Sequence, residues 1–565
     1  MKRHMRENYY VVDEGILTAH APGNRERPST EAELRKFRFS RLGPKGAPVD
    51  PAILEKVATA MTVSPGDPPA TQPVSDPPVP AGFTYLGQFI DHDLTKDVTD
   101  TALGDHVTVN QLLQGRSPAL DLDSLYGRGP EDAEHDLFYA PDKAKLKVGL
   151  TAAIPGTGTN VNLNGYDLPR VTQGSTKAER QAAQMPDRRN DENLAVAQTH
   201  LAFMRFHNRV VDKLADDGVP GNLLFERARA QVVRHYQWML KTDYLPQIVD
   251  QSIVDDVFTN GRRFLELPTP YDTRDTRDGR DGNGRYRHQK TGDRPTMPIE
   301  FSVAAFRLGH SMVRAHYNWN RIFAGDLGAS LALLFIFSGT SGNFNPFEPD
   351  VNNQESGLFE RLPTNWTVDW RRLFDFNADG TRPELAAPGG LNVAQRIDTL
   401  LVDPLAQLPE GTFGFGTGPT PIQLNLAFRN LVRANMVNLA SGQEMADFLG
   451  VPQLKPEDII AGGGTGAVLD AEGVLSAEEQ ATFASRTPLW FYILREAELN
   501  GGRLTGVGGH LVAEVFHRAM EGSRISIVRD PSWRPSLGDG DRFTMVDLLL
   551  FAFENNKDLL APLGD

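Results

Sequence analysis

The 565-residue chain contains no cysteine, which excludes disulfide bonds, thiolate metal sites, iron–sulfur clusters and cysteine nucleophiles. It also lacks an apolar run of about 18 residues, the length that a membrane-spanning helix needs. Basic residues are in the minority, with 58 Lys and Arg against 73 Asp and Glu. The net charge of −15 argues against a nucleic-acid partner, which requires a basic face. No apolar segment follows the charged start of the chain, so we expect no ordinary signal peptide. The protein is then expected in the cytoplasm or exported by a non-classical route.

Strand-like alternation is scarce, whereas apolar residues repeat at helical spacing in many segments. The predicted helices cover residues 192–214, 222–240, 302–313, 391–405, 421–449, 477–483 and 510–521. The 52 glycines and 39 prolines indicate long loops. The Pro-rich segment 64–80 suits a flexible linker or a loop that wraps the surface, and we favour the loop because it leads directly into the first motif. The sequence therefore predicts a mainly α fold with long loops and little β structure.

The first motif is the string Tyr-Leu-Gly-Gln-Phe-Ile-Asp-His-Asp-Leu at residues 85–94. In a helix, Gln88 and His92 lie on one face, because they are four residues apart. Asp91, His92 and Asp93 stand in a row among apolar residues, and burying three ionisable groups without a purpose is costly. The alternative is an exposed acidic turn with a hydrogen-bonded histidine.

The second motif, at residues 117–127, reads Ser-Pro-Ala-Leu-Asp-Leu-Asp-Ser-Leu-Tyr-Gly. Alternate positions offer a hydroxyl, a carbonyl and two carboxylates, and alternate residues of an extended chain face one side. Hard oxygen ligands of this kind suit Ca²⁺ better than zinc or copper. The alternative is a helix cap or turn made by Asp121 and Ser124.

Two further segments pair polar residues with helices. The string Asp-Arg-Arg-Asn-Asp-Glu at 187–192 precedes a long predicted helix, where acidic residues also serve as ordinary N-terminal caps. In the segment 427–433, Asn430 and Arg433 stand three residues apart on one helical face. That pair is also compatible with a solvated helix surface.

The segment 306–313 places Arg307 and His310 on one face of a helix, again three residues apart. Gly309 removes side-chain bulk beside the histidine, so a planar cofactor could approach there. The alternative is a histidine that is simply hydrogen-bonded in the core.

Taken in order, these segments resemble the animal-type haem peroxidases, the superfamily of myeloperoxidase and peroxidasin, and in particular its bacterial members. The resemblance runs from about residue 80 to 530, and the Gln-x-x-Asp-His-Asp string that begins at Gln88 is its most specific part. The strings at 487–494 and 508–515 also look like the C-terminal part of bacterial members. It implies a large single-domain haem peroxidase fold of the myeloperoxidase type at residues 79–565. Residues 1–78 would form an N-terminal arm and a Pro-rich wrapping loop.

The resemblance also implies a role for each candidate residue. On the peroxide side, His92 would be the distal histidine, Gln88 its pocket neighbour and Arg189 the distal arginine. His310 would bind the iron of haem b, and Asn430 would hold its other ring nitrogen. The remaining haem contacts would be ester links through Asp91 and Glu192 and pocket or propionate partners at Arg307 and Arg433.

The resemblance further implies a structural calcium site that ties the distal helix to the loop after it. Its ligands would be Asp93, Ser117, the carbonyl of Ala119, Asp121 and Asp123. The family often has serine where this chain has Asp123, and a carboxylate is an equally hard ligand.

The function implied is a monomeric peroxidase that uses hydrogen peroxide, through a ferryl intermediate, to oxidise bromide, iodide, thiocyanate or small phenols. Asn193 stands where myeloperoxidase has a methionine bonded to haem, which predicts a less oxidising haem and weak chloride activity. Arg307 stands where the fatty-acid oxygenases of the superfamily carry their radical tyrosine, which argues against a dioxygenase. The alternatives are such an oxygenase and a haem-bearing adhesion or interaction protein.

Overall fold

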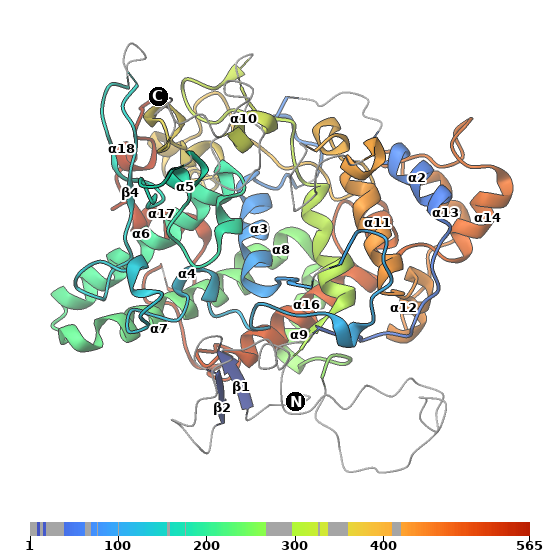
Figure 1. Ribbon diagram of the computed structural model, residues 1–565, viewed down its shortest axis with the longest axis horizontal. Coiled ribbons are helices and arrows are strands. Elements are labelled where there is room, and N and C mark those ends of the chain that lie inside the picture. The colour runs from blue at the N-terminus through green and yellow to red at the C-terminus, as the bar shows by residue number, and fades with distance from the viewer. Residues whose placement is uncertain are drawn as a thin grey trace.

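The computed structural model is mainly helical, as the sequence predicts (Figure 1). It describes residues 8–11, 15–18, 39–62, 69–75, 77–99, 101–154, 159–175, 177–266, 296–325, 328–336, 360–408, 420–538 and 540–565. The α-helices are α2 (Pro51–Ala60), α3 (Gly82–Leu94), α4 (Asp123–Tyr126), α5 (Lys177–Gln181), α6 (Leu194–Asp216), α7 (Gly221–Met239), α8 (Leu245–Ile248), α9 (Gln251–Asn260), α10 (Leu331–Ile336), α11 (Leu426–Met436), α12 (Gly442–Leu449), α13 (Pro456–Ala461), α14 (Ala477–Ser485), α15 (Leu489–Leu499), α16 (Gly506–Gly522), α17 (Met545–Ala552) and α18 (Lys557–Leu560).

The strands of the described part of the chain form short two-stranded pairs. Three pairs are antiparallel, namely β1 (Asn8–Val11) with β2 (Gly15–Thr18), β4 (Gly149–Leu150) with β5 (Asn164–Asp167), and β7 (His316–Tyr317) with β8 (Ala329–Ser330). The parallel pair joins β3 (Phe39–Ser40) to β6 (Met297–Pro298).

The centre of the molecule is α3, which packs against the long helix α6 and against the turn η6 (Ala305–His310) (Figure 1). Helix α6 begins where the Asn193 side chain accepts a hydrogen bond from the amide of Val196 at 3.0 Å, a standard N-cap. Helix α7 begins after Pro220 without a side-chain cap. This packing brings the first motif, on α3, beside the segment that carries His310.

Two predicted helices are interrupted. Residues 391–405 are irregular except for the 3₁₀ turn Asp403–Ala406, so the helix expected there was wrong. The segment 421–449 breaks into the turn Pro421–Leu424, α11 and α12. The second break has a local cause, because Asn438 adopts a left-handed φ of 47° and Ser441 starts α12 with a capping box.

The segment that carries His310 is not a regular α-helix. A π turn, η5 (Glu300–Ala304), is followed by the 3₁₀ turn η6, which ends at His310. Side chains three residues apart line up in a 3₁₀ turn, so Arg307 and His310 still share one face.

The arm expected at residues 1–78 contains α2, which packs against α11 and buries Leu54 and Val57 completely. Part of the Pro-rich segment is attached to the rest of the chain, because the buried Arg314 donates to the carbonyl of Gln72 at 2.8 Å and Val393 donates to that of Ala70 at 2.8 Å. Among the described residues, no helix combines the length and the apolar character needed to cross a membrane.

Candidate active site

His92 lies in the last turn of α3 and is 5% exposed. A hydrogen bond between its imidazole ring and Asn190 fixes its orientation. Its Nδ1 lies 2.8 Å from the side-chain oxygen of Asn190, while the amide nitrogen of Asn190 faces Nδ1 of His200 at 3.0 Å. Since an amide oxygen only accepts, Nδ1 of His92 carries the proton and Nε2 keeps its lone pair. Burial, with the nearby Arg189 charge, lowers the pKa of His92 to about 3. The ring is therefore a neutral base at physiological pH.

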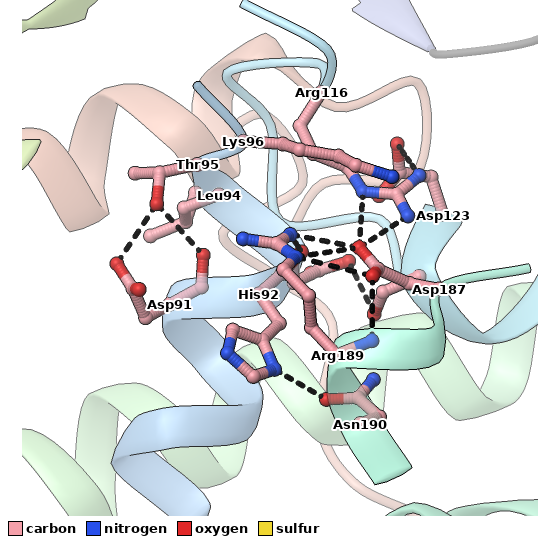
Figure 2. Close-up of polar contacts among 12 residues, drawn as sticks. Asp91, His92, Leu94, Thr95, Lys96, Arg116, Asp123, Asp187, Arg189 and Asn190 are labelled. Atoms are coloured by element: carbon pink, nitrogen blue, oxygen red, sulfur yellow. Dashed lines mark hydrogen bonds and ion pairs between the residues drawn. The ribbon is translucent and has the colours of Figure 1, made fainter. Parts of the chain in front are cut away.

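Arg189 is fixed beside this histidine, in the 3₁₀ turn η3 (Arg188–Asp191). Its Nη2 donates to the backbone carbonyl of His92 at 2.9 Å and pairs with the buried Asp187 at 2.7 Å. The guanidinium remains 28% exposed, so it is only partly occupied by these contacts. Figure 2 shows Arg189 and His92 side by side, from two elements that are far apart in the sequence.

Gln88, one turn before His92, connects α3 to the start of α6. It donates to Glu192 at 3.1 Å and accepts from the amide of Asn193 at 2.9 Å. Burial raises the pKa of Glu192 to about 8. Burial also raises the pKa of Asp91, which accepts a hydrogen bond from Thr95 at 3.0 Å (Figure 2).

His310 forms the second half of the site, on η6. The amide nitrogen of Asn430, on α11, lies 2.8 Å from Nδ1 of His310, so the predicted pair is brought together. Burial and the charges of nearby arginines lower the pKa of His310 to about 3, which keeps the imidazole neutral. A Cβ atom built on Gly309 meets no atom within 4 Å, so open space adjoins the histidine.

Three arginines gather around His310, namely Arg307, Arg429 and Arg433. Burial, followed by the charge of Arg433, lowers the pKa of Arg307 to about 10 and that of Arg429 to about 9. Three like charges close together favour an anionic partner. Arg307 and Arg433 were predicted from the sequence. Arg429 was not predicted, because it lies near Arg307 of η6, which is far away in the sequence.

Several candidate residues from both halves of the site are not fully buried. The residues that are only half-buried are Gln88, Asp91, Arg189, Glu192, Arg307, His310 and Arg433. Together with the open space beside Gly309, this exposure indicates room for a ligand between the distal residues and η6.

A cluster of buried carboxylates includes Asp93, the residue that follows His92 on α3. Asp93, Asp121 and Asp123 are each at most 2% exposed, and their oxygens lie within 4.8 Å of one another. The hydroxyl of Ser117 and Oδ1 of Asp123 are buried without a hydrogen-bond partner among the described residues. Burial raises the pKa of Asp93 and Asp123, and the charge of Asp123 raises that of Asp93 further. Ala119 lies fully buried in the same loop.

Arg116 connects this cluster to Arg189 through Asp187. No sequence motif pointed to Arg116. It donates from Nε to Asp187 at 3.0 Å and from Nη1 to Asp123 at 3.4 Å (Figure 2). Since Asp187 also binds Arg189, an unbroken chain of ion pairs runs from the carboxylate cluster to the site. Asn190 was missed too, although it lies inside the motif at 187–192.

Comparisons with known proteins identify the family that this chain resembles. Residues 93–327 match the animal haem peroxidase family, which confirms the resemblance drawn from the motifs. A peroxidase-like protein of Margaritifera margaritifera is 30% identical over 130 residues, which are 23% of this chain and 14% of that protein. Peroxidase mlt-7 of Caenorhabditis elegans is 27% identical over 126 residues, 22% of this chain and again 14% of the relative. The matches thus span only a small part of either relative.

A solved structure shares the fold over most of the chain. A fatty acid alpha-dioxygenase of Oryza sativa, solved with palmitic acid, superposes with a TM-score of 0.50 at 11% identity and covers 92% of this chain and 86% of that one. At this identity the likeness concerns the fold alone.

Proposed function

We propose that the chain, whose residues 93–327 match the animal haem peroxidase family, is a peroxidase that reduces hydrogen peroxide. The observation that carries this proposal is the pairing of a neutral, oriented His92 with Arg189 on one side of the site, with His310 on the other side. We further propose that residues 79–565 form the catalytic domain, since all these residues lie within it.

The residues around His310 fit haem. Haem, when bound, supplies the iron at which the peroxide bond is cleaved. Neutral His310, with open space beside Gly309, would suit binding of the haem iron, and the arginines near it would suit the negatively charged propionates. A half-turn of the Asn430 amide would place its oxygen against Nδ1, so that Nε2 keeps its lone pair for the metal.

His92 would move the proton of the peroxide. Its Nε2, free because Nδ1 is bound to Asn190, would take a proton from one peroxide oxygen and return it to the other as that oxygen leaves. Arg189 would stabilise the negative charge that develops on the leaving oxygen, because its position is fixed by Asp187 and the His92 carbonyl.

Asp91 and Glu192 would form the ester links to haem. Both carboxyl groups are half-buried, and burial raises the pKa of each. Acid–acetone extraction after exposure of the haem protein to peroxide tests this, because ester-linked haem stays with the protein. Haem that washes out freely would refute the links.

The carboxylate cluster fits Ca²⁺, which prefers several oxygen ligands and tolerates flexible geometry. Asp93, Asp121 and Asp123 would bind it with the orphaned hydroxyl of Ser117 and the carbonyl of Ala119. The ion would be structural, because it would hold the end of α3 next to His92 without contacting peroxide.

The proposed electron donors are bromide, iodide, thiocyanate and small phenols. Asn193 is engaged in the cap of α6 and in a bond to Gln88, and it cannot form the haem bond of a methionine. We therefore expect bromination to exceed chlorination of the same acceptor at neutral pH. Comparable rates of the two would contradict this expectation.

The decisive experiment is a visible spectrum of the haem-loaded protein with and without peroxide, followed by turnover of guaiacol or bromide. We expect a Soret band that shifts with peroxide, and a loss of about 10²–10⁴-fold in peroxide kcat/KM for His92→Gln, the usual contribution of an acid–base group. His316→Gln is the matched control, because His316 is exposed in β7. Oxygen uptake with linoleate and no peroxide would point to a fatty-acid oxygenase. A Soret band without turnover would point to a haem-bearing adhesion protein, and a colourless protein after expression with haem supply would contradict haem binding itself.

A further inference from the structure

A second cavity, of about 140 Å³, lies away from the candidate active site. It is enclosed by the end of α7, the π turn η4 (Leu240–Tyr244), α9, α16 and the segment 527–534. Helices α9 and α16 lie against each other at this place (Figure 1). None of the proposed haem, calcium or catalytic residues lines it.

One wall of the cavity is aromatic and rigid. Trp238 is fixed by a hydrogen bond from its indole nitrogen to the carbonyl of Asp541 at 3.1 Å and by an edge-to-face contact with Trp533 at 5.8 Å. Phe258, on α9, adds a second ring, which packs against His517 at 5.3 Å. Such rings accept a flat ligand by stacking or edge contact.

The other feature of the cavity is an excess of positive charge. Lys241 places its ammonium 5.5 Å from the ring centres of both Trp238 and Phe258, and it makes no hydrogen bond or ion pair with the described residues. Arg534 lies over the same Trp238 ring at 5.5 Å and pairs with Asp541 at 3.4 Å. Burial and the charge of Arg534 lower the pKa of Lys241, and the charge of Asp255 acts in the opposite direction.

The one carboxylate that lines the cavity is already engaged. Glu521 pairs with Arg262 at 2.9 Å, and both side chains are at most 1% exposed. A third lining cation, Arg529, donates to the backbone carbonyls of Ser523 and Arg524. With Glu521 paired to Arg262 and Arg534 paired to Asp541, the described residues that line the cavity still include more cations than carboxylates, which favours an anionic ligand.

We propose that this cavity binds a small aromatic carboxylate, with its ring against Trp238 and Phe258 and its carboxylate facing Lys241 and Arg534. The size supports one ring, because a cavity of about 150 Å³ accommodates benzene. An inorganic anion would leave the aromatic wall uncovered, and a neutral ring would leave Lys241 without a partner. This site is independent of the haem chemistry proposed above.

The proposal is tested by calorimetric titration of the full-length protein, with tryptophan fluorescence as a second signal. Benzoate is the probe, benzyl alcohol provides the ring without the charge, and acetate provides the charge without the ring. We expect benzoate to bind at least about tenfold more tightly than benzyl alcohol, since a hydrogen bond to a charged group contributes about that factor. It should also bind more tightly than acetate, because only benzoate buries a ring against the aromatic wall. Equal binding of benzoate and benzyl alcohol, or no binding of benzoate, would overturn the proposal on the wild-type protein alone.

Variants then locate the site. Lys241→Gln should weaken benzoate binding at least about tenfold, whereas Lys241→Arg should retain most of it. The matched control is Lys213→Gln, because Lys213 is exposed on α6 and does not line the cavity. Circular dichroism of each variant verifies folding, and unchanged benzoate affinity in folded Lys241→Gln would place the ligand elsewhere.

Discussion

Replacing Arg116 by glutamine tests whether the carboxylate cluster of Asp93, Asp121 and Asp123 and the guanidinium of Arg189 act as one unit. Arg116 is 6% exposed and bonds Asp187 at 3.0 Å and Asp123 at 3.4 Å. Asp187 in turn holds Arg189. The guanidinium of Arg116 also contributes to holding the pKa of Asp187 well below its usual value, despite burial that acts the other way.

The magnitude follows from what the substitution leaves behind. Removing one partner of a buried ion pair costs about 3–5 kcal/mol, because the remaining charge is buried without compensation. Asp187 keeps Arg189, so we expect the lower end, about 3 kcal/mol of unfolding free energy. With Asp187 less constrained, peroxide kcat/KM should fall about tenfold, short of the 10²–10³-fold, roughly, that follows outright removal of a charge-stabilising donor.

The assay combines urea unfolding, followed by circular dichroism, with stopped-flow measurement of the Soret band after peroxide is added. Arg128→Gln is the control, since Arg128 also bonds two carboxylates but is 29% exposed, and exposed pairs contribute about 0–1 kcal/mol. If Arg116→Gln unfolds like the control, the buried chain of ion pairs contributes little. If it is destabilised but its folded form reacts with peroxide at the normal rate, the coupling to Arg189 is refuted.

Four further outcomes are expected. Asn190→Ala should lower peroxide kcat/KM by about 10–10²-fold, measured by stopped flow, because His92 loses the acceptor of its Nδ1 proton. Gly309→Leu should lower the ratio of Soret to protein absorbance, because the side chain enters the space beside His310. Chelation with EGTA should lower the melting temperature of the wild-type protein, and Asp121→Asn should remove most of that effect. Burial raises the pKa of Asp398 from 3.8 to about 7, so its ionisation in the unfolded chain lowers stability as pH rises through that window. Asp398→Asn should therefore gain stability relative to wild type between pH 5 and about 7, in urea titrations.

Local patterns in the sequence were sufficient to predict the helices that show a clear apolar period. The apolar period located α6, α7, α14 and α16 within a few residues of their ends, because apolar side chains recur at helical spacing in each. The same reasoning failed at 391–405, where side chains are buried by distant parts of the chain without a helix. It also could not distinguish a regular helix from the π and 3₁₀ turns before His310, because these share most of the spacing of apolar residues.

Contacts between residues that are far apart in the sequence could be predicted only from the family resemblance, or could not be predicted. His310 and Asn430 are 120 positions apart, and the family motif alone suggested their pairing. His92 and Asn190 are 98 positions apart, and no motif reasoning pointed to that bond. Periodicity describes neighbours along one element, whereas an active site joins several elements. Asn190, Arg116 and Arg429 were not predicted, and each of them interacts with residues on another element.

Asn193 shows what the structure adds to a comparison of motifs. Read against the family, it marks only the absence of a methionine and of the haem bond that methionine makes. In the structure its oxygen caps α6 at 3.0 Å and its nitrogen holds Gln88 of α3 at 2.9 Å. Because Gln88 also binds Glu192, three polar side chains join the distal helix to the start of α6. These hydrogen bonds act together with the stacking of Phe89 on Phe203 at 4.6 Å, so the packing of α3 against α6 near His92 rests on contacts within the protein itself.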